Sequence, residues 1–214
     1  VGVIYFLHGM GSSHKRFREF TATNRYCLDN KLAIVYINAP MSFYSDMKYG
    51  MKYYTYITEE LPKFLKSAYN LDFPREKTFL AGLSMGGGGS VVYAQHHPEM
   101  FSACYSTSGL LDHRYRVVPT KVDEIEWLWS VAYTSPVEFL RHATAAEIEK
   151  LHTVRWMLDC GDDDGLIQTN LDFYSEMKRA KVNVEFRVRD GVHDWKFWRE
   201  ALPLILGFSF PVEK

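Results

Sequence analysis

The sequence predicts an α/β fold in which a mainly parallel sheet is covered by helices on both faces. Two observations predict it. Short apolar runs of strand length recur along the chain, and stretches with helical patterns separate most of these runs. Strands that alternate with helices pair in parallel and are buried on both faces. In such sheets, ligands bind at the carboxyl ends of the strands.

Six apolar runs are the strand candidates. They are Val3–Leu7, Leu32–Ile37, Thr78–Leu83, Ser102–Ser106, Val154–Asp159 and Val184–Arg189. The helical candidates are Tyr53–Tyr69, Ser90–His97, Asn170–Ala180 and Trp195–Leu206, and the second of these is expected to begin after four consecutive glycines, Gly86 to Gly89. Because the Leu32–Ile37 run is apolar throughout, we expect it in the interior of the sheet, with further strands before Val1.

The 214 residues are most simply one domain, 1–214. One stretch, 110–151, breaks the alternation of strands and helices. It has mixed polarity and an aromatic cluster, namely Trp127, Trp129, Tyr133 and Phe139. We predict that this stretch is a helical, cap-like insertion over the carboxyl edge of the sheet. The alternative is an ordinary crossover helix with a long loop.

Composition excludes several classes of function. A formal net charge of −1 and the lack of a basic run argue against a nucleic-acid partner. The sequence contains no run of eighteen apolar residues, so it predicts no membrane span. Three cysteines, Cys27, Cys104 and Cys160, lack metal-ligand spacing and are predicted to be core residues. We expect no metal and no cofactor. A homo-oligomer stays open, and a cytoplasmic location is favoured over secretion or a periplasmic location after removal of a signal peptide.

A glycine-flanked serine follows the apolar run Thr78–Leu83. The segment Gly-Leu-Ser84-Met-Gly matches G-x-S-x-G, the nucleophile elbow of α/β-hydrolases, where a strand passes directly into a helix. Ser84 must adopt a strained backbone to raise its hydroxyl above the sheet, and side chains at positions 82 and 86 would collide with neighbouring backbone. Five residues are a weak signal, so the prediction depends on catalytic partners further along the chain.

Candidate partners follow the last two predicted strands. A nucleophilic serine needs a base and an acid that orients the base, and α/β-hydrolases place them in the order Ser, Asp or Glu, His. Here an acidic segment, Asp162 to Asp164, follows one strand, and His193 follows the next. We predict His193 as the base. The residues alone leave the acid open among the three aspartates, whose alternative role is a solvated turn that caps the next helix.

Two backbone N–H groups are needed to bind the oxyanion of an acyl-transfer reaction. One is expected from Met85, directly after the nucleophile, and the other from Met10, in the glycine-rich loop that follows the first strand. The alternative for both methionines is core packing. We expect His8, in the same loop, to be a structural residue and not a second base.

Six ordered segments together resemble the esterase branch of the α/β-hydrolases, which includes tributyrin esterases, S-formylglutathione hydrolases, and the feruloyl and acetylxylan esterases of carbohydrate esterase family 1. The segments are Leu7–Ser13, Asn38–Met47, Tyr53–Pro62, Gly82–Gly87, Cys160–Leu166 and Gly191–Trp195. The resemblance covers almost the whole chain. It implies Ser84, Asp164 and His193 as the catalytic triad, because the family acid lies four residues after a cysteine in this pattern.

The chain departs from the pattern of this branch at two glycines. The family usually has an aromatic residue where Gly88 stands, which predicts a roomier pocket floor or a looser helix after the elbow. Gly165 likewise stands in place of a bulky residue. Members of the branch also have strands before the His-Gly loop, in agreement with the expectation of sheet preceding Val1.

The predicted function is that of a serine carboxylesterase that hydrolyses short acyl esters through an acyl-enzyme. The substrate is expected to be a small-molecule or carbohydrate-linked ester, including acetyl or feruloyl esters of plant polysaccharide. Phe43, Tyr44 and Trp127 are the predicted substrate contacts, with core packing as the alternative. The alternative functions are an S-formylglutathione hydrolase, an acyltransferase of the same fold, and a catalytically silent domain that binds a ligand.

Overall fold

The computed structural model describes residues 2–47, 50–112 and 135–210. Six strands form one parallel sheet in the order β2-β1-β3-β4-β5-β6. The strands are β1 (Val3–Leu7), β2 (Ala33–Ile37), β3 (Thr78–Leu83), β4 (Ala103–Thr107), β5 (Arg155–Gly161) and β6 (Glu185–Arg189). Each of the six predicted strands is therefore confirmed, with ends that differ by at most two residues.

Helices connect the strands. They are α1 (Arg16–Phe20), α2 (Thr23–Asn30), α3 (Tyr53–Thr55), α4 (Leu61–Tyr69), α5 (Met85–His96), α7 (Pro136–His142), α8 (Ala145–Leu151), α9 (Ile167–Arg179) and α10 (Trp195–Ser209). A π-helical turn, Tyr56–Glu60, joins α3 to α4, so the predicted helix over this range is present. Helices α1 and α2 are not predicted from the sequence, because helices this short show too little periodicity.

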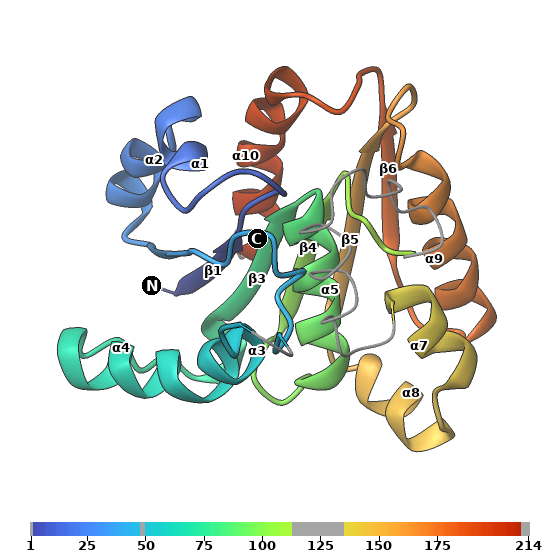
Figure 1. Ribbon diagram of the computed structural model, residues 1–214, viewed down its shortest axis with the longest axis horizontal. Coiled ribbons are helices and arrows are strands. Elements are labelled where there is room, and N and C mark those ends of the chain that lie inside the picture. Colours follow the sequence, from blue (N-terminus) through green and yellow to red (C-terminus); the bar gives the residue numbers. More distant parts are fainter. Residues whose placement is uncertain (1, 48–49, 113–134, 211–214) are drawn as a thin grey trace.

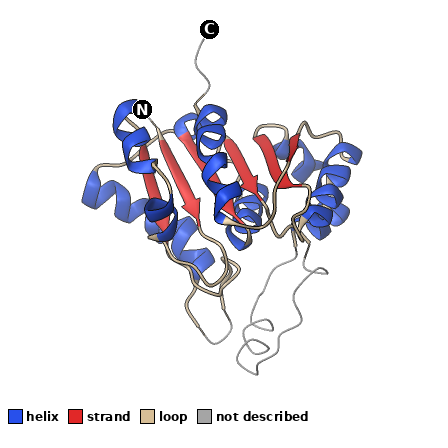
Figure 2. Ribbon diagram, turned by 90° about the horizontal axis from the view of Figure 1, so that it is seen from above, coloured by secondary structure: helices blue, strands red, loops and turns tan. Residues whose placement is uncertain are grey.

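Alternate residues of the strands face two separate apolar layers. Along β1, Val3, Tyr5 and Leu7 pack into one layer, and Ile4 and Phe6 pack into the other. The first layer is filled from α4, α5 and α9, and the second mainly from α10. Figures 1 and 2 show helices on both sides of the sheet. This double cover explains why β1, β3 and β4 are buried at every position.

Strand β2 lies at the edge of the sheet in the described part of the chain, where it pairs with β1. Among the strands that the structure describes, β2 is therefore an edge strand and not the interior strand that was expected. Ala33 and Val35 still pack against one apolar layer, and Ile34 and Tyr36 against the other, so partial cover of both faces accounts for the apolar run. Strands preceding Val1 stay a prediction.

The described end of the predicted insertion packs into the helical layer. Helix α7 contacts α5 and α9, and its Val137 and Leu140 side chains are buried in the core. Helices α7 and α8 lie between β4 and β5 in the chain. This arrangement of the described residues is the one expected for a crossover connection, which was the alternative to a cap. Trp127, Trp129 and Tyr133 lie outside the described residues, so the cap stays a prediction for residues 113–134.

Helix α5 begins at Met85 and contains all four glycines, so the predicted start after Gly89 is wrong. Glycine has a low helix propensity, but tertiary contacts override it here. A Cβ on Gly86 would overlap the carbonyl oxygen of Leu7, and a Cβ on Gly88 would overlap that of Leu110. The glycines allow the start of the helix to lie directly against the ends of neighbouring strands.

The space beside Gly88 is therefore filled by backbone, and the roomier pocket floor predicted at this position is absent. The N–H of Leu110 also donates to the carbonyl oxygen of Ser84 over 3.1 Å, so this contact holds the residue that precedes α5. In contrast, a Cβ on Gly165 would meet nothing within 4 Å. The second departure from the family pattern leaves open space.

We expect Gly88→Ala to destabilise the protein although alanine favours helices. Displacing backbone at position 110 costs about 1–3 kcal/mol, which exceeds the propensity gain of about 1 kcal/mol. The matched control is Gly207→Ala in α10, where a Cβ meets nothing within 4 Å. Thermal unfolding should give a lower Tm for Gly88→Ala and a higher one for Gly207→Ala. An equal rise in both variants would contradict the close contact at Leu110.

The structure also bears on the functions that composition argues against. None of the helices within the described ranges is long and apolar enough to cross a bilayer. No group of three or more His, Cys, Asp or Glu side chains in those ranges is arranged to hold a metal ion. All three cysteines are unpaired; Cys104 and Cys160 are buried, as predicted, and Cys27 is half-buried.

Candidate active site

The parallel sheet brings the ends of β3, β4, β5 and β6 to one edge. Leu83 pairs with Thr107, Thr107 with Asp159, and Gly161 with Arg189. The loops after β3, β5 and β6 therefore leave the sheet side by side. These are the loops that carry Ser84, Asp164 and His193.

Ser84 lies at the turn between β3 and α5 with φ of 56° and ψ of −121°. A positive φ is strained for a residue with a side chain, and such strain persists only where the surroundings enforce it. The Ser84 N–H donates to the oxygen of Thr107 over 3.0 Å. A Cβ on Gly82 would overlap the backbone of Gly86, so the turn requires glycine there. These features are the ones expected of a nucleophile elbow.

His193 contacts both other members of the predicted triad. Its Nε2 lies 2.9 Å from Oγ of Ser84, and its Nδ1 lies 3.0 Å and 2.9 Å from the two carboxylate oxygens of Asp164. With the proton on Nδ1, the ring donates to Asp164 and leaves Nε2 free to accept from the serine hydroxyl. This geometry is that of a nucleophile, a base and an acid in sequence.

Of the three adjacent aspartates, Asp164 is the one that contacts His193. Asp162 instead accepts hydrogen bonds from the N–H groups of Asp163 and Gly191, and it thereby ties the acid loop to the histidine loop. Asp164 also accepts from the N–H of Leu166 over 2.8 Å, just before α9 begins. Helix α9 has no side-chain cap and Asp164 is buried, so Asp164 does not have the alternative role of a solvated, helix-capping residue.

The carboxyl of Asp164 is buried, and burial by itself would raise its pKa. Hydrogen bonds from His193, the Leu166 N–H and the Ser108 hydroxyl outweigh burial and hold the pKa of Asp164 below its usual value. Asp164 is therefore ionised at neutral pH. An ionised carboxylate is the form that accepts a hydrogen bond from Nδ1 and orients the imidazole.

The loop after β1 lies beside Ser84. A Cβ on Gly9 would be 3.3 Å from Cβ of Ser84. Met10 follows Gly9 in a turn closed by a bond from the Ser12 N–H to the Gly9 oxygen, and its side chain is 41% exposed. Core packing is therefore not the role of the Met10 side chain. Its N–H stays the predicted second oxyanion donor.

Met85 is the first residue of α5. Its side chain is buried, so the core-packing alternative holds for that part of the residue. Its backbone N–H belongs to the first turn of the helix, where N–H groups have no partner within the helix and the helix dipole favours negative charge. The predicted donor role of Met85 uses this N–H and stays a prediction.

His8 is buried and bonded on both sides to backbone. Its Nδ1 lies 2.8 Å from the oxygen of Gly9, and its Nε2 accepts from the N–H of Ala39 over 3.2 Å. Burial lowers the pKa of His8, which favours the neutral ring that these two bonds require. The ring fixes the loop after β1 to the loop after β2, in agreement with its expected structural role.

The aromatic residues predicted to contact substrate have other positions. Tyr44 is 0% exposed; its hydroxyl donates to the oxygen of His8 over 2.8 Å, and its ring lies against Gly89 of α5. The substrate contact predicted for Tyr44 is not met, because the ring has no exposed surface. Phe43 is also buried, and Trp127 lies outside the described residues.

Sequence reasoning missed a group of side chains behind the triad. Ser108 follows β4 with φ of 49°, and Trp198 in α10 donates from Nε1 to its Oγ over 3.1 Å. Arg189 at the end of β6 forms two hydrogen bonds, of 2.8 Å and 2.7 Å, with the buried carboxylate of Asp159. These residues come from four separate elements, so spacing along the chain carries no signal of their contact.

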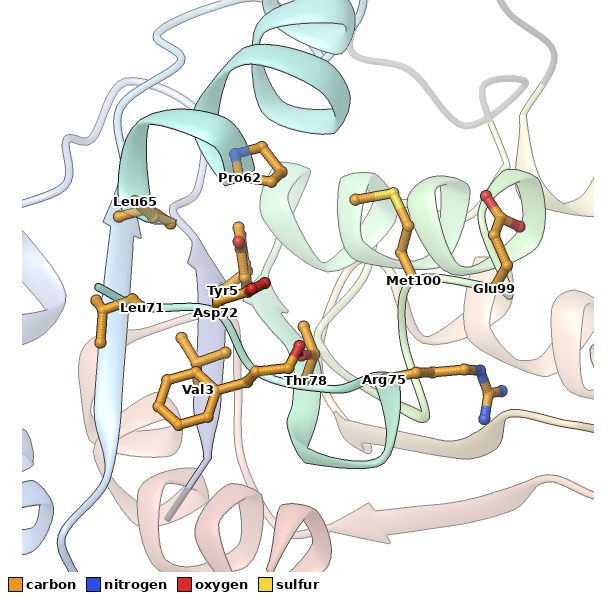
Figure 3. Close-up of a pocket in the computed structure, with 11 residues that line it drawn as sticks. Val3, Tyr5, Pro62, Leu65, Leu71, Asp72, Arg75, Thr78, Glu99 and Met100 are labelled. Carbon is orange, nitrogen blue, oxygen red and sulfur yellow. Dashed lines mark hydrogen bonds between the residues drawn. The ribbon is translucent and has the colours of Figure 1, made fainter. Parts of the chain in front are cut away.

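A hollow of about 200 Å³ lies elsewhere, at the amino ends of β1 and β3. Figure 3 shows Val3, Tyr5 and Thr78 from these strands, with Leu65 and Met100 from the flanking segments. None of the triad residues lines it. Because Ser84 follows the carboxyl end of β3, this hollow is on the opposite edge of the sheet from the candidate catalytic residues.

Comparisons with known proteins give one matching family and several similar proteins. The model of the Esterase family, described as "Putative esterase", matches residues 1–209. The acetyl esterase of Caldicellulosiruptor saccharolyticus is 24% identical over 218 residues, which cover 93% of this chain and 79% of that protein. The diacylglycerol acyltransferase/mycolyltransferase Ag85A of Mycobacterium leprae is 27% identical over 221 residues, covering 85% of this chain and 66% of that protein.

Solved structures show the same fold. A ferulic acid esterase superposes with a TM-score of 0.85 and 34% identity, covering 97% of this chain and 84% of that chain. The fluorophosphonate-binding serine hydrolase FphF of Staphylococcus aureus superposes with a TM-score of 0.86 and 28% identity, covering 98% of this chain and 84% of that chain.

Proposed function

The chain belongs to the Esterase family and is a carboxylic ester hydrolase of the α/β-hydrolase fold, and from this premise we propose that it is a serine esterase for short acyl esters. The observation that carries the proposal is the pair of contacts made by His193. Its Nε2 lies 2.9 Å from the Ser84 hydroxyl, and its Nδ1 lies 2.9 Å from the Asp164 carboxylate.

The first half of the reaction forms an acyl-enzyme. His193 Nε2 takes the proton of the Ser84 hydroxyl as Oγ attacks the ester carbonyl carbon. Asp164 stabilises the imidazolium that results, since its carboxylate accepts the Nδ1 proton. The imidazolium then gives its proton to the oxygen of the leaving alcohol as the bond between this oxygen and the carbonyl carbon breaks. The alcohol departs, and the acyl group stays on Oγ of Ser84.

The tetrahedral intermediate carries a negative oxygen that needs two donors. The Met85 N–H, at the start of α5, and the Met10 N–H, in the loop beside Ser84, are assigned to it. Two preorganised backbone donors in a partly buried site stabilise the transition state more than water does.

The second half repeats the chemistry with water. His193 takes a proton from a water molecule, which attacks the acyl carbonyl, and the carboxylic acid leaves as the proton returns to Ser84. No step needs a cofactor. An alcohol in place of this water would give acyl transfer, which is the second candidate function because of the match to the mycolyltransferase.

The substrate class follows from the relatives and stays part of the proposal. An acetyl esterase and a ferulic acid esterase are among the similar proteins, so we assign acetyl or feruloyl esters, including those carried by plant polysaccharide. The competing assignments are the thioester of an S-formylglutathione hydrolase and a silent domain that binds a ligand without turnover.

Covalent labelling tests the proposal. A fluorophosphonate should react with the serine oxygen, with loss of fluoride, and add its mass to the peptide that contains Ser84. A panel of acetyl, butyryl, acetyl-xylan and feruloyl esters, with S-formylglutathione beside them, should then show turnover that the same reagent abolishes. An enzyme that binds no fluorophosphonate and cleaves none of the esters would be the silent domain. Products that carry an added alcohol in place of water would favour acyl transfer.

A further inference from the structure

Ser108 is a buried residue with a strained backbone directly behind the triad. It is 0% exposed, follows the end of β4, and has φ of 49°. Its N–H donates to the oxygen of Asp159 over 2.7 Å, which holds the backbone in this conformation. A residue with a side chain adopts a positive φ only where the surroundings enforce it, and such residues concentrate at functional sites.

The hydroxyl of Ser108 has a defined direction. The indole Nε1 of Trp198 can only donate, and it lies 3.1 Å from Oγ of Ser108. The hydroxyl therefore accepts from Trp198 and keeps its single hydrogen for another acceptor. We assign the carboxylate of Asp164 as that acceptor, because the Ser108 side chain contributes to the lowered pKa of Asp164.

Trp198 also contacts the base. Its ring lies perpendicular to the imidazole of His193, with 4.9 Å between the ring centres, and Trp198 is largely buried in the apolar layer formed by α10. One side chain thus packs against the histidine and orients the hydroxyl that donates to the acid. The acid and the base are fixed relative to each other by α10 and the loop after β4.

We propose that Ser108 and Trp198 are positioning residues of the triad: Trp198 packs against His193 and directs the Ser108 hydroxyl toward Asp164, so that the carboxylate faces Nδ1 of His193. The proposal rests on the serine-esterase function above. Neither residue contacts the reacting atoms; both act through Asp164 and His193.

The charged and titratable groups around Asp164 are His193, from the loop after β6, and the Cys160 thiol, from β5. Burial and the nearby carboxylates raise the pKa of Cys160, so its thiol keeps its proton and adds no second negative charge beside Asp164. The donors to Asp164 lower its pKa, so they stabilise the folded protein above the usual carboxyl pKa, and this contribution is lost as the pH falls through the lower folded value. Removing the Ser108 donor should move the titration of Asp164 to higher pH.

Three variants test the proposal. Ser108→Gly removes the hydroxyl and tolerates the positive φ, so backbone strain does not confuse the result. Trp198→Phe keeps a ring beside His193 and removes the N–H. Trp156→Phe is the matched control, because its Nε1 donates to the oxygen of Leu151 over 2.9 Å, before the start of β5 and away from the triad.

The test has two measurements. Steady-state kinetics with an ester give kcat and KM, and carboxyl ¹³C NMR follows the titration of Asp164. Ser108→Gly is expected to lower kcat by about tenfold or more, as for loss of a hydrogen bond to a charged group, with KM unchanged and the Asp164 titration at higher pH. Trp198→Phe should act in the same direction with a smaller effect. Trp156→Phe should leave both quantities unchanged.

An Asp164 titration that stays in place in Ser108→Gly would overturn the proposal, whether or not kcat falls, because a purely structural role lowers kcat without moving that titration. Failure of the serine-esterase function gives a different result from failure of the positioning role. If only the esterase function fails, no activity depends on Ser84, but the titration of Asp164 still moves in Ser108→Gly.

Discussion

Replacing Ser84 with alanine is expected to lower kcat by roughly four to six orders of magnitude. The variant keeps the Cβ and the strained backbone, so the elbow should still form, but it lacks the oxygen that attacks the ester. His193 and Asp164 then have no nucleophile to activate. Residual turnover would come from the oxyanion donors and from substrate binding alone.

The measurement is turnover of p-nitrophenyl acetate, with thermal unfolding to show that the fold is retained. Ser90→Ala is the matched control, since Ser90 lies in the same helix, is buried, and donates to the oxygen of Gly87 over 2.8 Å. The control should keep kcat within a few fold. A Ser84→Ala protein with a tenth of the parent activity would rule out Ser84 as the nucleophile.

The second large effect is expected in stability, from Arg189→Met. Arg189 holds the 0% exposed carboxylate of Asp159 through two hydrogen bonds, and its guanidinium lies over the ring of Phe197 at 3.8 Å. The variant leaves a buried carboxylate that keeps a hydrogen bond from the Tyr105 hydroxyl, over 3.1 Å. Leaving such a charge without its ion-pair partner costs about 3–5 kcal/mol of unfolding free energy.

Urea unfolding at neutral pH measures this loss. The matched variant is Arg189→Met with Asp159→Asn, which removes the charge and keeps an acceptor for Tyr105. We expect the double variant to be more stable than Arg189→Met alone, because the unpaired charge is the main cost. If the two variants unfold at the same urea concentration, the loss comes from the packing of Arg189 on Phe197 and not from the ion pair.

Much of the fold could be predicted from local patterns. Most of the six strands can be predicted because burial of both faces leaves a short apolar run. Strand β6 is half-exposed and alternates apolar with charged residues, which is the other local pattern of a strand. The start of α5 could not be found, because four glycines oppose a helix locally. Contacts with Leu7 and Leu110, distant in sequence, decide that the helix begins at Met85.

The candidate site divides in the same way. The motif around Ser84 and the position of His193 after the last strand predicted two members of the triad from chain order. Only the family resemblance singles out Asp164 among three adjacent aspartates, and Asp164 is the one that contacts His193. Tyr44 shows the limit of composition, since an aromatic residue in a loop can serve a ligand or the core, and this one is buried.

Residues close together in the chain are enough to predict the parallel α/β architecture, the elbow at Ser84 and the loops that carry its partners. Which aspartate faces His193, and which side chains lie behind it, depends on contacts between distant parts of the chain. Ser108, Asp159, Arg189 and Trp198 meet because parallel strands end at one edge and α10 packs across them. Contacts of this kind depend on the register of the sheet, which no local pattern of the chain records.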